Sequence, residues 1–349
     1  MKIGIVTLPL HFNFGGILQA YALQEILQKM GCDSFVIRPY ERSIKAILKT
    51  FLYKQSGVSR FVKRHIRFDC LHEPFNLDEL KTKGYDMLIV GSDQVWRPCM
   101  GINREANINR YFLKTIGTGQ IKKISYAASF GVDYLDFTQK EKEQAEKLIK
   151  DFAAVSVREQ SGITLCFDFF NRKDACLVLD PTMLLFSTDY LNIMGKSPFK
   201  TGNKHCFIYM LDYTKAENQK HVKDFIPLNA EVITAKVERN IFKKYFEVKD
   251  TVEGWLSAIY NSDLMITDSF HGCVFSILFH KDFYVMENAV GGNTRIYSLL
   301  SLFGLKDRLI SKEVNNKNAK PIEWQQVDMR LRDLRNFSFD FLNKSLSHD

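Results

Sequence analysis

The chain has 349 residues, of which 46% are hydrophobic and 25% are charged, and its formal net charge is +8. This composition is typical of a soluble globular protein of about two domains, and it excludes disordered and fibrous proteins. No apolar run reaches the roughly 18 residues that a membrane-spanning helix needs, and the first residues do not form a convincing signal peptide. We therefore expect a cytoplasmic protein.

The spacing of cysteines and histidines argues against a disulfide framework and against a metal site. The seven cysteines are scattered and include no Cys-x-x-Cys pair. His11, His65 and His205 are not spaced as metal ligands usually are. We expect reduced thiols, no metal ion and no cofactor.

Strands and helices alternate along the first half of the chain. The β-branched stretch at 2–8 predicts a strand, "HFNFGG" at 11–16 predicts a glycine-rich loop, and apolar residues at helical spacing then predict a helix that Gly31 ends. A capping box of Thr138 with Glu141 opens another helix. Further strands are expected within 34–40, 85–93, 122–131, 153–159 and 175–181. This alternation predicts a parallel sheet that helices cover on both faces.

Most of the excess positive charge lies between Glu41 and Arg67, where eight basic residues face one acidic residue. The apolar residues of this segment recur at helical spacing, which predicts one or two basic amphipathic helices that rest on an anionic membrane surface. The alternative is a solvated helix face over the core. Because the excess is local, we expect no nucleic-acid partner.

The second half repeats the alternation and predicts a second α/β domain. Strands are expected within 205–211, 230–235, 263–268 and 282–286, and helices within 214–226, 252–262 and 271–279. Thr214 and Glu217 have the spacing of a capping box. The predicted fold class is α/β, with two doubly wound Rossmann-like domains that face a central cleft. The expected parts are an N-terminal domain (1–185), a linker (about 183–203), a C-terminal domain (200–322) and a helix that packs back on the first domain (323–349).

Several loops taken together resemble one protein family. They are "HFNFGGILQAYALQ" (11–24), "MLIVGSDQVWRP" (87–98), "ISYAASFG" (124–131), "VSVREQSG" (155–162), "LDPTMLL" (179–185), "SDLMITDSFHGCVFSILFHKDFYVM" (262–286) and "GGNTRI" (291–296). In this order they resemble the polysaccharide pyruvyl transferase family over about residues 1–305.

The resemblance implies a fold similar to two-domain glycosyltransferases of the B type. Members whose reaction is known move the enolpyruvyl skeleton of phosphoenolpyruvate onto two sugar hydroxyls, which gives a cyclic pyruvate ketal and phosphate. We therefore expect phosphoenolpyruvate as the co-substrate. The expected acceptor is a saccharide of a capsular or exopolysaccharide precursor, which a polyprenyl diphosphate carries in one version of this hypothesis. In that version the enzyme contacts the inner face of the membrane through segment 41–67.

Phosphoenolpyruvate carries a carboxylate and a phosphate, so its site needs cationic side chains and open backbone N–H groups. Arg158 is the expected guanidinium fork, and the helix that begins near His271 and Gly272 offers N–H groups and a positive dipole end. His271 is the expected acid for the methylene carbon. The alternatives are a structural salt bridge for Arg158 and a hydrogen-bonded core histidine for His271.

The chain departs from the family pattern at Ser269, where many members have an arginine. We assign Ser269 to the donor side, and we expect Arg295, with Asn293 beside it, to supply the missing cationic contact. A surface salt bridge is the alternative for Arg295.

The expected acceptor-binding residues follow strands of the first domain, and they are Asn13, Gly15, Gly16, Ser92, Gln94, Trp96 and Ser129. Asn13 is the side chain that we expect to bind sugar hydroxyls, and Trp96 either stacks on a sugar ring or holds its loop from a buried position. The alternative for Gly15 and Gly16 is that they only allow close helix packing. Asp93 is the expected acceptor of hydroxyl protons. Asp180, which precedes Pro181, is expected to fix a turn.

Two other functions fit the same pattern. A glycosyltransferase of the B type would use a nucleotide sugar on the same architecture. A non-catalytic saccharide-binding protein would keep the cleft but lack the donor site, as Ser269 suggests. His271 and Arg158 argue against this last hypothesis.

Overall fold

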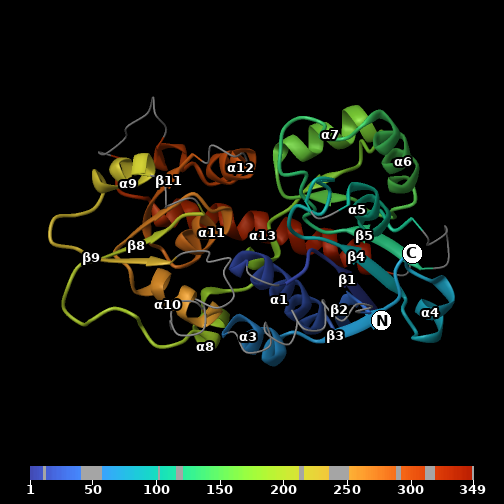
Figure 1. Cartoon of the computed structure of the whole chain (residues 1–349), viewed down its shortest axis with the longest axis horizontal. Coiled ribbons are helices and arrows are strands. Elements are labelled where there is room, and N and C mark those ends of the chain that lie inside the picture. Colours follow the sequence, from blue (N-terminus) through green and yellow to red (C-terminus); the bar gives the residue numbers. More distant parts are fainter. Residues whose placement is uncertain are drawn as a thin grey trace.

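The computed structural model describes residues 1–10, 13–40, 57–100, 103–114, 121–211, 216–235, 251–287, 292–310 and 319–347. It has two α/β lobes, each built on a five-stranded parallel sheet (Figure 1). The strand order is β3-β2-β1-β4-β5 in the first lobe and β12-β11-β10-β8-β9 in the second. The predicted fold class of two doubly wound, Rossmann-like domains is therefore confirmed.

The first sheet contains β1 (Lys2–Val6), β2 (Asp33–Pro39), β3 (Phe68–Leu71), β4 (Met87–Val90) and β5 (Lys122–Ser125). A short parallel pair lies beside β5 and contains β6 (Ser156–Val157) and β7 (Cys176–Leu177). The second sheet contains β8 (His205–Tyr209), β9 (Glu231–Ala235), β10 (Leu264–Thr267), β11 (Asp282–Met286) and β12 (Leu309–Ile310). The central strands β4, β8 and β10 are buried along their whole length, because helices cover both faces of each sheet.

The helices of the first lobe are α1 (Phe14–Lys29), α3 (Gly57–His65), α4 (Leu77–Thr82), α5 (Arg104–Tyr111), α6 (Gln139–Ile149) and α7 (Gln160–Phe170), followed by the short 3-10 helix η1 (Pro181–Met183). The remaining helices are α8 (Ser187–Ile193), α9 (Ala216–Lys223), α10 (Val252–Asn261), α11 (Phe270–Leu278), α12 (Asn293–Phe303), the 3-10 helix η4 (Lys306–Arg308) and α13 (Trp324–Leu346). The predicted capping box at Thr138 is present, whereas Thr214 lies outside the described residues.

Each sheet has a point where the strand order reverses, between β1 and β4 in the first lobe and between β8 and β10 in the second. In doubly wound folds, ligands bind beyond the carboxyl ends of the strands at this point. In the first lobe, Gln19 of α1 ties the two loops together, because its amide donates to Thr7 Oγ1 (3.0 Å) and accepts from Ser92 N (2.9 Å). In the second lobe, Thr267 donates to the carbonyl of Tyr209 (2.7 Å).

Helix α1 is buried on nearly all sides, since thirteen of its sixteen residues are inaccessible to solvent. A helix that is hydrophobic all round belongs in the centre of a protein. Its first residue, Phe14, stacks on Trp255 of α10, with ring centroids 5.6 Å apart, and also contacts Tyr209 of β8. The first turn of α1 therefore joins the core of the second lobe.

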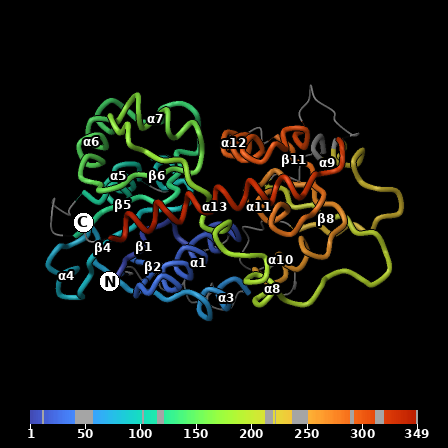
Figure 2. Tube along the Cα trace, turned by 180° about the vertical axis from the view of Figure 1, so that it is seen from behind, coloured from blue at the N-terminus to red at the C-terminus, as the bar shows by residue number. Residues whose placement is uncertain are grey.

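Helix α13 crosses from the second lobe to the first (Figure 2). At its start, Trp324 stacks on His280 of the second lobe, with centroids 4.7 Å apart. Further along, the hydroxyl of Ser338 accepts a hydrogen bond from Leu179 N (3.0 Å) in the first lobe. Helix α13 thus fastens the two lobes together.

The basic segment is described from residue 57 onward, and residues 41–56 lie outside the described residues. The apolar side of α3 is not available to a membrane, because Val58, Phe61 and Val62 are buried, with Phe61 against Tyr21 of α1. This part of the segment matches the alternative of a solvated helix over the core. Contact between its exposed basic side chains and lipid stays a prediction, which sedimentation with anionic vesicles would test.

The expected linker contains regular structure. Helix α8 lies within it and is anchored by the buried Tyr190, whose hydroxyl donates to the carbonyl of Thr182 (2.8 Å).

No helix in the described ranges combines the length and the hydrophobicity that a bilayer crossing requires.

Candidate active site

The N-termini of α1 and α11 meet where the two lobes face each other. A Cβ atom added to Gly15 of α1 would lie 2.7 Å from His271 Cβ and closer still to the imidazole ring. Only glycine therefore allows His271 to lie directly against the backbone of α1. Gly15 thus matches the alternative of close helix packing, because it accommodates His271 of α11.

His271 is held in a nearly buried position at the start of α11. Its Nε2 atom is 3.7 Å from Asp180 Oδ2, which is too far for a hydrogen bond. Among the described residues, Nε2 has no hydrogen-bond partner. The imidazole is thus placed beside a carboxylate with one nitrogen still able to bind another group.

Asp180 is the hub of a buried polar network. One carboxylate oxygen accepts hydrogen bonds from Arg158 (2.8 Å) and from the hydroxyl of Ser92 (2.9 Å). The other accepts hydrogen bonds from the backbone N–H and the hydroxyl of Thr182, so that Asp180 is the N-cap of η1. Burial opposes ionisation, but His271 and Arg158 outweigh it and hold the pKa of Asp180 well below its usual range. The predicted turn is present, yet the larger role of Asp180 is to face His271.

Arg158 does not offer the open fork that we expected. Its guanidinium is fully buried and donates to Asp180 (2.8 Å) and to Asp93 (3.1 Å), and its face lies 4.6 Å from the ring centroid of Phe270. Burial disfavours its charge, but the two carboxylates more than compensate and raise its pKa. Arg158 therefore matches the alternative of a structural salt bridge, because its charge is already neutralised.

Asp93, Gly16 and Asn13 lie together beside the start of α1. Asp93 adopts a left-handed backbone conformation (φ 75°), which is uncommon outside glycine. Its Oδ1 pairs with Arg158, while Oδ2 accepts no hydrogen bond from the described residues and points toward Gly16. Asn13 is exposed and its side chain does not cap α1. Asn13 is therefore open to an acceptor, whereas Asp93 is buried with its Oδ2 free of hydrogen bonds from the described residues.

Three other expected acceptor residues are buried instead. Trp96 is 1% exposed, donates from its indole N–H to Tyr111 O (3.2 Å) and stacks on Phe112. It holds its loop in the core and cannot stack on a sugar. Ser92 binds Asp180, and Ser129 accepts from Gly131 N (3.0 Å), so both hydroxyls position loops.

Gln94 lies in the loop that also contains Ser92 and Trp96. A Cβ on Gly131 would lie 2.8 Å from Gln94 Cδ, so the amide packs directly on this glycine, whose φ is also positive. The Oε1 atom of Gln94 accepts a hydrogen bond from Arg97 (3.2 Å). Gln94 thus orients Arg97, a residue that sequence analysis did not single out.

Ser269 and Gly272 have structural roles at the start of α11. The Ser269 hydroxyl accepts from Gly272 N (3.4 Å) as the N-cap. A Cβ on Gly272 would lie 3.0 Å from Met265 Cε and from Thr267 Cβ, so glycine lets α11 approach β10. One of the helix N–H groups that we expected to face the donor is therefore already capped.

Arg295 and Asn293 lie in the first turn of α12, which packs on α7. Arg295 folds over Gly292 and makes no ion pair or hydrogen bond with a described residue. Burial and the nearby charge of Arg158 lower its pKa to about 10. Across from it, burial raises the pKa of Glu159, the residue that precedes α7.

Buried polar atoms without a hydrogen bond are concentrated in the segments through which the lobes face each other. Seven of the eleven such atoms in the described ranges are Arg97 Nε, Arg158 Nε, Glu159 Oε2, Ser161 Oγ, His271 Nε2, Thr294 Oγ1 and Arg295 Nε. Native proteins satisfy most buried polar groups, so this concentration is typical of a site that a ligand completes.

No group of three or more His, Cys, Asp or Glu within the described ranges is arranged to hold a metal ion.

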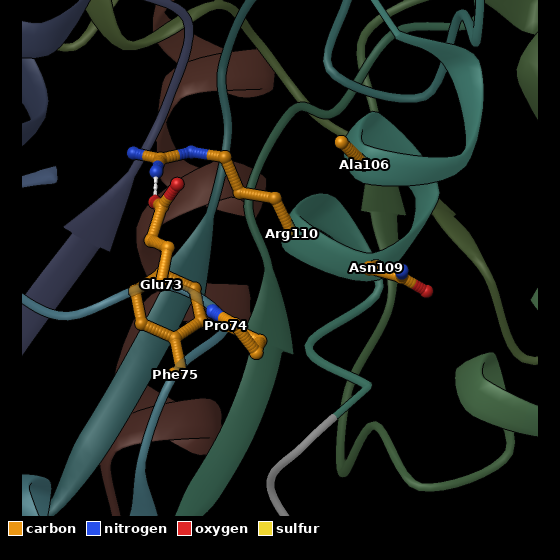
Figure 3. A pocket seen from close by; sticks show the side chains of 6 residues that line it. All are labelled: Glu73, Pro74, Phe75, Ala106, Asn109 and Arg110. Carbon is orange, nitrogen blue, oxygen red and sulfur yellow. Dashed lines mark ion pairs between the residues drawn. The ribbon is translucent and has the colours of Figure 1, made fainter. Parts of the chain in front are cut away.

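A separate cavity of about 250 Å³ lies in the first lobe (Figure 3). It is lined by Glu73, Pro74, Phe75, Ala106, Asn109 and Arg110. Arg110 points at Glu73 and pairs with it, so the two charges cancel. This cavity contains none of the predicted site residues and offers no free charge to an anion.

Comparison with known proteins gives one family match. Residues 13–289 match the model of the family described as "Polysaccharide pyruvyl transferase". No curated protein sequence matches the chain. Among solved structures, the chain is similar to a protein assigned as a UDP-N-acetylglucosamine 2-epimerase from Listeria monocytogenes, with 10% identity, a TM-score of 0.51 and coverage of 99% of this chain and 91% of that one.

MurG of Acinetobacter baumannii is also similar, with 10% identity, a TM-score of 0.42 and coverage of 99% of this chain and 95% of that one. Identities this low bear on the fold alone. The family match covers well over half of the chain, including the strand-order reversal of the second lobe and His271. The chain therefore belongs to the polysaccharide pyruvyl transferase family.

Proposed function

We propose that the protein forms a pyruvate ketal on a sugar of a capsular or exopolysaccharide precursor, with phosphoenolpyruvate as donor and phosphate as the released product. The observation that carries this proposal is His271, which is fixed between Gly15 and Asp180 where the two lobes meet, with Nε2 unpartnered. The position suits a proton donor, because histidine is the side chain that commonly exchanges protons near neutral pH, and this one lies beside the Asp180 carboxylate.

The proposed chemistry uses this placement. His271 protonates the methylene carbon of the donor, so C2 gains oxocarbenium character and one sugar hydroxyl adds to it. The C2–O bond to phosphate then breaks, and the second hydroxyl adds to C2 and closes the ketal. The two sugar hydroxyls lose two protons. One of them restores the proton that His271 gave to the methylene carbon, and the other leaves on the phosphate. Asp93, through Oδ2, accepts the hydroxyl protons, and Asn13 binds the sugar.

Thermal unfolding with candidate donors tests this function before the acceptor is known. A ligand that binds only the folded state at 100 times its Kd adds about 2.7 kcal/mol of stability, which raises the midpoint by several degrees. We expect phosphoenolpyruvate to raise the midpoint and uridine and guanosine diphosphate sugars to leave it unchanged. Stabilisation by a nucleotide sugar alone would contradict the proposal and support a glycosyltransferase.

Turnover is tested by phosphate release with a panel of pyranosides that carry neighbouring free hydroxyls. We expect release to require both phosphoenolpyruvate and a suitable sugar, and to fall about 10²–10⁴-fold in His271→Gln, as is usual for loss of a general acid. His280→Gln is the matched control, because this exposed histidine stacks on Trp324 away from the site. Equal loss in both variants would remove His271 from the mechanism. Sugar binding without any release would support a saccharide-binding protein.

A further inference from the structure

Two arginines whose Nε atoms are buried without a hydrogen bond come from opposite lobes. Arg97 follows β4 in the first lobe, and Arg295 lies in the first turn of α12 in the second. Thr294, beside Arg295, also has a buried hydroxyl without a partner in the described ranges. Guanidinium and hydroxyl groups donate hydrogen bonds, and phosphate oxygens accept them.

Arg97 is only weakly held by the protein. One guanidinium nitrogen donates to Gln94 Oε1 (3.2 Å), and Nε is 3.7 Å from Asp136 Oδ2. The side chain is 19% exposed. Most of its hydrogen-bonding capacity is therefore available to a ligand.

Packing contacts place the Arg97 loop and α12 on two sides of Glu159. Gln94 packs on Gly131, and the backbone N–H of Gly131 donates to Glu159 Oε1 (3.3 Å). Glu159 precedes α7, whose first N–H, from Gln160, donates to Ser298 of α12 (3.1 Å). Figure 1 shows α7 and α12 facing each other from the two lobes.

The charges in this region favour a dianion near Arg97 and Arg295. Asp180 and Asp93 already neutralise Arg158. Burial and the charge of Arg158 lower the pKa of Arg295, Asp93 and Glu159 act in the opposite direction, and Arg97 makes the smallest contribution, which lowers it. Burial raises the pKa of Glu159, while the charges of Arg158 and Arg295 act to lower it.

We infer that Arg97 and Arg295, assisted by Thr294, bind the phosphate group of the donor, and that Arg158 is a positioning residue for Asp180 and Asp93. This inference rests on the proposed function in taking phosphoenolpyruvate as the donor. Two arginines can surround a phosphate with paired N–H donors. Because they come from different lobes, the donor also bridges the lobes.

Isothermal titration with phosphoenolpyruvate and with inorganic phosphate tests this site. We expect Arg97→Gln and Arg295→Gln each to weaken both ligands about tenfold or more, and the double variant to abolish phosphate binding. Arg104→Gln is the matched control, because Arg104 shares Asp136 with Arg97 but pairs mainly with Glu141. Its ligand affinities should equal those of the wild type. Circular dichroism and unfolding midpoints verify that each variant is folded.

The outcomes separate this site from the proposed function. If phosphoenolpyruvate binds equally to the wild type, Arg97→Gln and Arg295→Gln, the inference is overturned while the donor assignment stands. If inorganic phosphate binds through both arginines but phosphoenolpyruvate is never consumed with any sugar, the site is supported and the proposed function fails. If the wild type binds neither ligand, both are overturned.

Discussion

Two of the contacts between the lobes differ in character. The α1–α11 contact, formed by Gly15, His271, Asp180 and Arg158, is close-packed and its charges are paired. The α7–α12 contact is joined by one hydrogen bond between Gln160 and Ser298, and polar atoms without partners surround it.

This difference separates two tasks of an enzyme site. In the proposed reaction His271 is the general acid, which needs neighbours that allow it one position, and the α1–α11 contact has such neighbours. A binding site for a charged substrate needs donors that the protein has not satisfied, because a paired guanidinium such as Arg158 has little left to offer. The α7–α12 contact meets this second need.

The largest effect is expected from Asp180→Asn. This substitution leaves the Arg158 charge buried with a weaker partner, and breaking a buried ion pair typically costs about 3–5 kcal/mol. Urea unfolding should show a loss of this size. Asp174→Asn is the matched control, because Asp174 pairs with Arg172 but is 61% exposed, and it should lose less than about 1 kcal/mol. Equal losses would mean that the network around Asp180 does not stabilise the fold.

The difference in unfolding free energy between the wild type and Asp180→Asn also depends on pH. The folded-state pKa of Asp180 is lower than its unfolded value of about 3.9. Its ionised form therefore stabilises the fold above about pH 4, and this contribution is lost as the pH falls further. The difference in unfolding free energy between wild type and Asp180→Asn should shrink by roughly 1 kcal/mol between pH 6 and pH 3. A difference that grows on acidification would contradict this sign.

A smaller effect with a sharper contrast is expected from two neighbouring glycines. In Gly15→Ala the new methyl group overlaps with the His271 ring, and overpacking of this kind costs about 1–3 kcal/mol. In Gly16→Ala the nearest atoms are Asp93 Oδ2 at 3.2 Å and Asn13 Nδ2 at 3.3 Å, which are side-chain ends that can move. Alanine also favours helix by up to about 1 kcal/mol over glycine.

Unfolding free energies should therefore fall in Gly15→Ala and stay equal or rise in Gly16→Ala. Phosphate release should be lost in Gly15→Ala, since His271 is displaced. If both variants have the same stability and activity, the close approach of His271 to α1 is not required.

Sequence alone predicted the fold and the placement of His271, because these depend on local signals. The alternation of apolar strands with helices indicated two parallel sheets, and the polar turn before "HGCVFSILF" indicated a helix that starts at the end of a strand. The short strand β3 was missed, since four residues carry little periodicity.

The pairing of side chains from distant segments could not be predicted in this way. Arg158 and Trp96 stand in loops that match the family, but whether their side chains face a ligand or the core depends on residues far along the chain. Asp180 lies 22 residues from Arg158, and Trp96 stacks on Phe112. A carboxylate directly after an apolar strand was the one signal that pointed to Asp180, and it was interpreted as a turn.

The smallest effect, on the α7–α12 contact, is expected from Ser298→Ala. The substitution removes the hydroxyl that accepts a hydrogen bond from the N–H of Gln160. This N–H lies in the first turn of α7, where backbone donors have no partner within the helix. Since this hydrogen bond is exposed, the loss should be about 0.5–1 kcal/mol. Ser301→Ala is the matched control, because Ser301 lies on the same helix, is exposed and forms no side-chain hydrogen bond with a described residue. The difference between the two unfolding midpoints isolates the Gln160–Ser298 bond from the helix preference of alanine. Identical midpoints would mean that solvent replaces this bond, and the α7–α12 contact would then depend on the bound donor alone.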